Sequence, residues 1–181
     1  MPTEVSSLLG EVGAPPRLIA HLTLVHEVAC RLIDALKKQF PSLCLDRDLV
    51  LMGAALHDVG KAVVTSELSG PGPLHEEAGY HLLRERGVDE RVALLVRDHA
   101  KWSADTSIEG LLVSVADKIW KGKRVEELES LLLKVILSQA GEAGERWNAF
   151  IVLDEILETL AADADKRLLI QSQYPVHGGP T

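Results

Sequence analysis

His57 and Asp58 are the side chains in this sequence best suited to carry chemistry, and they directly follow an apolar segment over residues 49–56. Burying a carboxylate is costly unless the group is paired or binds a metal. Helices commonly end at a glycine, and Gly60 follows closely, with Lys61 next to it. The sequence therefore predicts a helix whose C-terminal end presents two metal ligands, with a lysine close by to meet an anion.

Other imidazole and carboxylate groups stand on apolar faces or at the ends of further predicted helices. Asp117 follows an apolar run over residues 111–116, where a solvated carboxylate is not expected. Imidazole and carboxylate together suit iron, manganese, cobalt, nickel or zinc. Along the chain, five predicted helices each contribute to the candidate ligand set: His21, His57 with Asp58, His75, His99 and Asp117.

Six such ligands are more than one zinc ion needs and enough for two metal ions. Asp58 could bridge the two ions with its two carboxylate oxygens. Two metals roughly 3.5–4 Å apart can activate a water and stabilise charge on a transferring phosphoryl group.

The first helix offers a second candidate ligand, His26. His21 and His26 are five residues apart, which is about 140° around a helix, so we do not expect both to face one site. His21 is in phase with the apolar residues Val25 and Ala29 at steps of four, and we prefer it on that basis.

The elements that position these residues are predicted to be helices, because no segment shows sustained period-two alternation. The fold class is all-α, a single-domain bundle of about six to eight helices over residues 1–171, with a flexible tail at 172–181. The metal-site core covers about 15–125, and further helices cover about 125–170. The predicted helices cover residues 16–40, 46–58, 75–86, 89–100, 107–120, 125–140 and 145–170, the last two separated near Gly141 and Gly144.

Composition narrows the classes of function. The chain has 181 residues and a formal net charge of -8 without a basic stripe, which argues against binding duplex nucleic acid. Its two cysteines, Cys30 and Cys44, form no CxxC pair and fit a reducing compartment. The sequence shows neither a signal-peptide pattern nor a long apolar run, so we expect a cytoplasmic protein that does not enter a membrane.

The ordered ligand set, with the surrounding His57-Asp58-Val59-Gly60-Lys61 and Ala116-Asp117-Lys118, resembles the HD-domain phosphohydrolase superfamily over about residues 15–125. The resemblance implies an all-α HD fold with a dinuclear site of six ligands. It places one metal ion at His21, His57, Asp58 and Asp117, and the second at His75 and His99 with Asp58 bridging.

The same resemblance implies a metal-dependent phosphohydrolase that uses a metal-activated hydroxide on a nucleotide or another small phosphorylated metabolite. Asp58 and Lys61 would be catalytic, and Lys61, Lys118 and Trp102 would bind substrate. Lys61 could instead interact with its helix C-terminus, and Trp102 could be a core residue.

The expected cofactors are two divalent or mixed-valent transition-metal ions, with iron or manganese preferred over cobalt, nickel or zinc. One alternative is a mixed-valent di-iron oxygenase, because some relatives hold such an iron pair with the same six ligands. A non-catalytic nucleotide sensor is the other alternative, although degenerate relatives of that kind usually lose ligands. The sequence leaves open whether the protein forms a homodimer.

Overall fold

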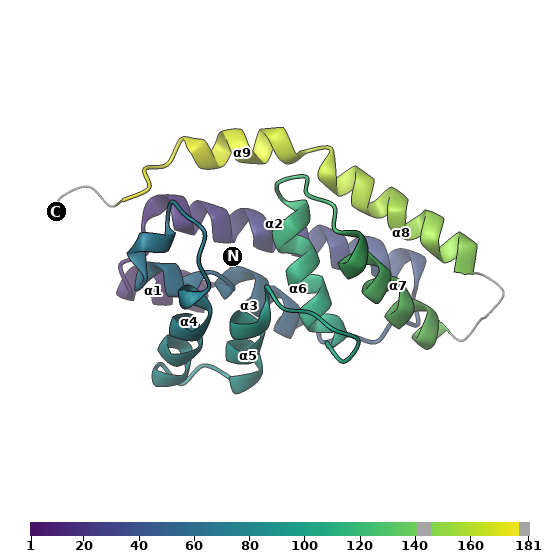
Figure 1. Ribbon diagram of the computed structural model, residues 1–181, viewed down its shortest axis with the longest axis horizontal. Helices are drawn as coiled ribbons and strands as arrows, with labels where there is room; N and C mark the ends of the chain where they lie inside the picture. Colours follow the sequence, from purple (N-terminus) through teal and green to yellow (C-terminus); the bar gives the residue numbers. More distant parts are fainter. Residues whose placement is uncertain (141–145, 178–181) are drawn as a thin grey trace.

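The computed structural model describes residues 1–140 and 146–177, and within these ranges the chain is helical without strands (Figure 1). The predicted all-α fold class is thereby confirmed. The α-helices are α1 (Thr3–Glu11), α2 (Pro16–Gln39), α3 (Arg47–Leu56), α4 (Leu74–Glu85), α5 (Glu90–Asp98), α6 (Ile108–Ile119), α7 (Glu126–Ala140), α8 (Arg146–Ala161) and α9 (Ala164–Ser172).

Two elements differ from the sequence prediction. Helix α1 was not predicted, although it buries Val5 and Leu9 on one face. The single helix predicted over 145–170 is two helices, because the chain breaks between α8 and α9 at residues 162–163. The predicted break near Gly141 and Gly144 and the helix start at 145 lie outside the described residues.

Residues 59–73, between the helices predicted over 46–58 and 75–86, contain two short 3-10 helices, η1 (Val59–Ala62) and η2 (Thr65–Glu67). Helix α3 begins where expected, since the Asp46 carboxylate accepts a hydrogen bond from the Leu49 amide at 3.1 Å. This N-cap satisfies an amide that has no partner inside the helix.

Helix α2 runs along the length of the molecule and contacts α3, α6, α8 and α9 (Figure 1). It contributes to both hydrophobic clusters of the fold. One cluster is built on the later turns of α2 with α6, α7 and α8. The other joins α1, the start of α2, the end of α3 and α5.

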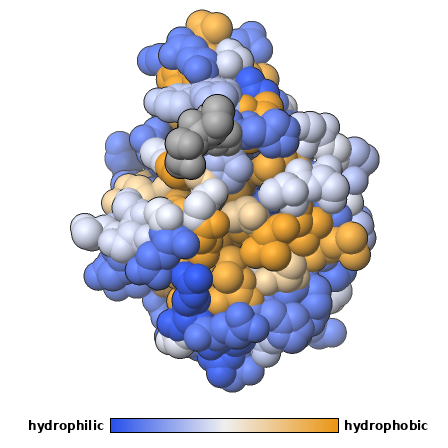
Figure 2. Space-filling model, turned by 90° about the vertical axis from the view of Figure 1, so that its left-hand side faces the viewer, coloured by the Kyte–Doolittle hydropathy of each residue, from blue (hydrophilic) through white to orange (hydrophobic). Residues whose placement is uncertain are grey.

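At the end of the molecule where α1 lies, apolar surface gathers between polar margins (Figure 2). Leu8, Val12 and Ile19 pack there against the second cluster but are only partly buried. None of the helices in the described part of the chain combines the length and hydropathy needed to cross a membrane.

Candidate metal centre

Five helices and their ends bring all six predicted ligands to one place. They are buried, with at most 7% of each residue exposed. His57 and His99 are the C-terminal caps of α3 and α5, and Asp58 follows His57 directly. The remaining three stand in the first turn of α4, in the second turn of α2, and in the last turn of α6: His75, His21 and Asp117.

The two carboxylate oxygens of Asp58 face different histidines. Oδ2 lies 3.2 Å from His21 Nε2 and 3.7 Å from His57 Nε2. Oδ1 lies 3.0 Å from His75 Nε2 and 3.6 Å from His99 Nε2. Asp58 therefore stands between two pairs of imidazoles, as a bridging carboxylate would.

Asp117 lies beside the first of these two pairs of imidazoles, His21 and His57. Its Oδ1 lies 3.3 Å from His57 Nε2 and 4.0 Å from His21 Nε2. The donor atoms of His21, His57 and Asp117 lie within 4.8 Å of one another, and so do those of His57, Asp58 and His99. Such a set of nitrogen and oxygen donors fits a divalent transition-metal ion.

Hydrogen bonds on the far side of two imidazole rings fix which nitrogen faces the centre. Nδ1 of His57 lies 2.9 Å from the Ala54 carbonyl, and Nδ1 of His99 lies 2.7 Å from the Val96 carbonyl. Because a carbonyl oxygen can only accept, Nδ1 carries the proton and donates. In its neutral form, each of these rings presents the lone pair of Nε2 to the centre, as in protein metal sites.

Charge within the cluster keeps the two carboxylates ionised. Burial opposes the charged form, but His57, His21 and His75 outweigh it and hold the pKa of Asp58 well below its usual range. Burial likewise opposes the charged form of Asp117, but contacts with His57 and Lys118 hold the pKa of this carboxyl well below its usual value. Burial, aided by His57, lowers the pKa of His99 to about 4, which favours the neutral, metal-binding ring.

Two lysines lie against the ligand carboxylates at the edge of a cavity of about 450 Å³. Lys61 Nζ donates to Asp58 Oδ2 at 2.6 Å, and Lys118 Nζ donates to Asp117 Oδ2 at 2.6 Å. Both lysines are only partly buried. This arrangement places positive charge between the ligands and the open side of the cavity.

The C-terminal segment forms part of the wall of this cavity, through Gln171 and Val176. Arg17, near the start of α2, holds it. Its side chain donates to the carbonyls of Ser172 and Tyr174, and its amide donates to the carbonyl of Pro175. Of the tail predicted over 172–181, residues 172–177 are therefore placed against α2, and 178–181 lie outside the described residues.

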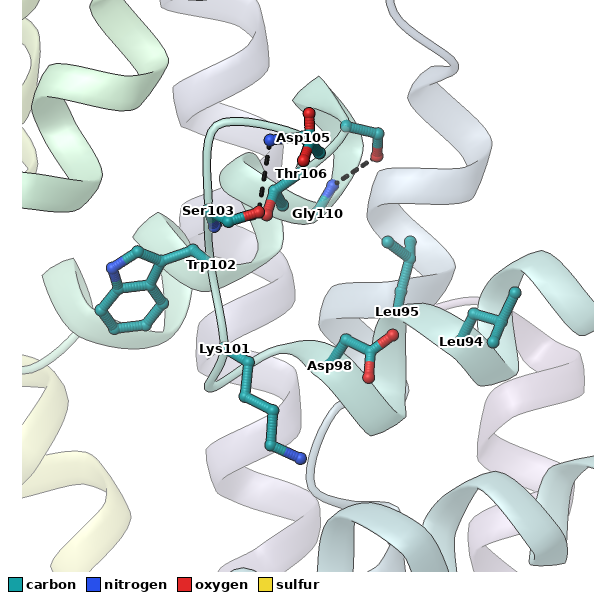
Figure 3. Close-up of a pocket in the computed structure, with 10 residues that line it drawn as sticks. Leu94, Leu95, Asp98, Lys101, Trp102, Ser103, Asp105, Thr106 and Gly110 are labelled. Atoms are coloured by element: carbon teal, nitrogen blue, oxygen red, sulfur yellow. Dashed lines mark hydrogen bonds between the residues drawn. The ribbon is translucent and has the colours of Figure 1, made fainter.

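Trp102 lies beside this cavity without being among the described residues that line it. It lines a neighbouring cavity of about 440 Å³ between the end of α5 and the loop before α6. Figure 3 shows the Trp102 ring on the opposite side of this loop from Leu94 and Leu95. Lys118 Nζ is 5.9 Å from the ring centre, within reach of a cation–π contact, and connects Trp102 with the ligand cluster.

The other histidines lie outside the two ligand clusters. His26 is buried on α2 with its Nδ1 3.9 Å from Cys30 Sγ. His81 is exposed and pairs with Glu77 at 3.2 Å, and His177 is exposed in the C-terminal segment. The structure thus places His21, rather than His26, beside Asp58.

Glu67 is a buried residue at this centre that the sequence analysis missed. It ends η2, and its Oε2 lies 2.6 Å from His75 Nδ1. The loop sequence carries no local signal for this contact, because seven residues that include glycines and prolines separate Glu67 from His75.

Comparison with known proteins finds one family match and several curated relatives. The HD domain matches residues 18–120. The tRNA (cytidine(56)-2'-O)-methyltransferase of Thermoplasma volcanium is 28% identical over 155 residues, which cover 77% of this chain and 42% of that protein. Ribonuclease Y of Acidothermus cellulolyticus is 29% identical over 153 residues, which cover 74% of this chain and 30% of that protein.

This chain spans less than half the length of these two relatives. No solved structure matches it. The HD domain match covers more than half of the chain and includes all six candidate ligands. The chain therefore belongs to the HD domain family.

Proposed function

We propose that this protein is a metal-dependent phosphohydrolase that acts on a nucleotide or another small phosphorylated compound. The observation that carries the proposal is the position of Asp58, whose two oxygens face separate pairs of histidines. A carboxylate between two sets of nitrogen donors is suited to bridge a pair of metal ions.

In this proposal, His21, His57, Asp58 and Asp117 hold one ion, and His75 and His99, with Asp58 bridging, hold the other. Iron and manganese are the ions we expect among the transition metals that mixed imidazole and carboxylate ligands suit. Bound metal would supply Lewis acidity, which lowers the pKa of water and neutralises charge on phosphoryl oxygens.

The chain itself supplies the groups that hold a phosphate near the ligands. Lys61 and Lys118 are partly exposed to the cavity, and their ammonium groups neutralise Asp58 and Asp117. We propose that both lysines contact substrate phosphate oxygens. Trp102, whose ring makes a cation–π contact with Lys118, is proposed to contact the non-phosphate part of the substrate.

A small substrate is favoured over a long polynucleotide. The cavity of about 450 Å³ has the size of a small-molecule site. The formal net charge of -8 disfavours extended contact with a phosphate backbone. The name of the relative Ribonuclease Y makes RNA the competing substrate that a test must include.

The test combines elemental analysis with phosphate release from nucleotides and cleavage of a short single-stranded RNA, with manganese, iron and cobalt added in turn. We expect bound metal and hydrolysis of a small phosphoester or anhydride, both lost in Asp58→Asn. Asp34→Asn is the matched control, because Asp34 is an exposed carboxylate paired with Arg47.

Three outcomes would contradict this proposal. RNA cleavage without hydrolysis of small substrates would replace the substrate class. Iron-dependent oxygen consumption without phosphate release would indicate an oxygenase. Tight nucleotide binding without turnover would indicate a sensor.

A further inference from the structure

Glu67 makes three contacts with the first turn of α4. Its Oε1 accepts a hydrogen bond from the Leu74 amide at 3.0 Å. Its Oε2 accepts one from the His75 amide at 3.0 Å and lies 2.6 Å from His75 Nδ1. One carboxylate therefore accepts hydrogen bonds from two backbone amides at the start of α4 and also contacts the imidazole of His75 in the same turn.

This carboxylate stands where a local cap is missing. Pro73 precedes α4 and provides no side-chain hydrogen bond to the helix. The first amides of a helix have no partner inside it, so they need an outside acceptor. Glu67 supplies that acceptor from a separate 3-10 turn and remains buried, with 6% of the residue exposed.

The contact with Nδ1 determines how His75 faces the centre. An ionised carboxylate can only accept, so Nδ1 of His75 carries the proton and donates a hydrogen bond to Glu67. Nε2 then has a free lone pair, and it lies 3.0 Å from Asp58 Oδ1. A carboxylate behind a ligating histidine fixes the ring and raises its basicity.

The loop is shaped around this carboxylate. A Cβ at Gly72 would come within 2.1 Å of Glu67 Oε1, whereas a Cβ at Gly70 would meet only the Ser66 carbonyl, at 3.9 Å. The backbone on the other side of His75 is equally close, since a Cβ at Gly60 would lie 2.0 Å from the His75 carbonyl. His75 is thus confined between η1 and Glu67.

We propose that Glu67 is the positioning residue that sets the tautomer and orientation of His75 for the second metal ion. This inference rests on the proposed function, because it assigns His75 to a metal. It adds that the 59–73 loop, through Glu67, controls the affinity of one metal position and leaves the other unchanged.

The main test compares metal binding by Glu67→Gln and Glu77→Gln. Both changes remove one negative charge near the start of α4, but Glu77 is exposed and pairs with His81. We expect Glu67→Gln to weaken one of two manganese-binding steps by about 10- to 100-fold in a calorimetric titration. Glu77→Gln should match the wild type, and equal weakening in both variants would overturn the proposal.

A second pair of variants moves the carboxylate without changing its charge. Gly72→Ala should displace the flexible end of Glu67 and weaken the same binding step, while Gly70→Ala should leave it unchanged. This pair keeps the test informative if Glu67→Gln destabilises α4. Unchanged manganese affinity in a folded Gly72→Ala variant, judged by circular dichroism, would contradict the role of Glu67.

A spectroscopic reading separates this inference from the proposed function. Nitrogen-15 spectra of the metal-free protein at alkaline pH should show His75 protonated at Nδ1 in the wild type, with population moving to Nε2 in Glu67→Gln. A wild type that binds no metal would contradict the proposed function, yet this tautomer change would still support the contact. An unchanged tautomer would contradict the positioning role whatever the metal result.

Discussion

At the scale of single residues, the centre consists of buried polar groups that contact one another. Asp58 is buried with its oxygens divided between two pairs of imidazoles, and each carboxylate of the cluster also meets a lysine. Burial of so many polar groups is costly unless they are paired or bind a metal. Their arrangement is therefore explained better by ligand binding than by stability.

The choice between His21 and His26 gives the first prediction. His21→Ala should lower the amount of bound metal, because it removes a nitrogen 3.2 Å from Asp58. His26→Ala should keep the wild-type metal content, since His26 contacts Cys30 instead. Elemental analysis of both purified variants decides this, and metal loss in His26→Ala alone would reverse the assignment.

His26 also predicts a pH dependence of stability. Burial, together with the N-terminal ammonium group and Arg47, lowers its pKa from 6.5 to about 4. Below pH 6.5 the unfolded chain binds a proton that the folded chain does not, so stability falls as pH drops toward 4. We expect this residue to cost about 1–2 kcal/mol at pH near 5.

Urea unfolding of the metal-free wild type and His26→Gln, at neutral pH and near pH 5, measures this contribution. The variant should lose less stability than the wild type over this interval. The other histidines are common to both proteins, so their effects cancel in the difference. Equal losses would show that His26 does not titrate as its surroundings indicate.

The sequence was informative about single residues where polarity contradicted the surroundings. His57, Asp58 and Asp117 each interrupt an apolar segment, and all three lie in the cluster. Glu67 could not be found this way, since it lies in a polar loop. Its role depends on a contact formed only when η2 folds against α4.

At the scale of elements, helices with a clear apolar period and a capping residue were predictable. Helix α1 carries such a period at Val5, Leu8 and Leu9 but has no side-chain cap, because Pro2 precedes it. The break between α8 and α9 has no sequence signal, because alanines and Asp163 stand there rather than glycine or proline. The break between α8 and α9 is explained instead by the tertiary contacts of Arg167.

Arg167 in α9 joins the ends of two other helices. Its Nε donates to the Trp120 carbonyl at 2.6 Å, and its Nη2 donates to the carbonyls of Ile119 at 3.0 Å and Leu160 at 2.7 Å. These carbonyls lie at helix C-terminal ends, where partners inside the helix are missing. One buried guanidinium therefore fixes the junction of α6, α8 and α9.

Replacing this side chain tests the junction. Arg167→Met keeps much of the volume but leaves the carbonyls without their donor, so we expect a loss of about 2–4 kcal/mol in unfolding free energy. Lys166→Met is the matched control, because Lys166 is exposed on the same helix. Denaturant unfolding of both variants gives the comparison, and equal stabilities would mean that Arg167 does not hold the junction.

At the scale of the whole molecule, the candidate ligands come from helices that are far apart in the sequence. His21 on α2 and Asp117 on α6 are separated by most of the HD domain match, and His75 and His99 enter from α4 and α5. The unfolded chain does not hold these groups together. Any ion bound by all of them must therefore favour the folded state.

This linkage predicts that metal raises the thermal stability of the entire fold. An ion present at about 100 times its dissociation constant adds about 2.7 kcal/mol to the free energy of unfolding. For a chain of this size, that corresponds to a rise in Tm of about 5–10 °C. Calorimetry of the protein with manganese or with a chelator measures the difference.

The variant Asp58→Asn separates this linkage from a general effect of divalent ions on the surface. Because Asp58 faces both pairs of histidines, its loss should remove most of the manganese-dependent rise in Tm. Asp34→Asn, an exposed carboxylate paired with Arg47, should retain the full rise. A rise of the same size in all three proteins would place the stabilising ion away from the cluster, and the fold would then not depend on metal at this centre.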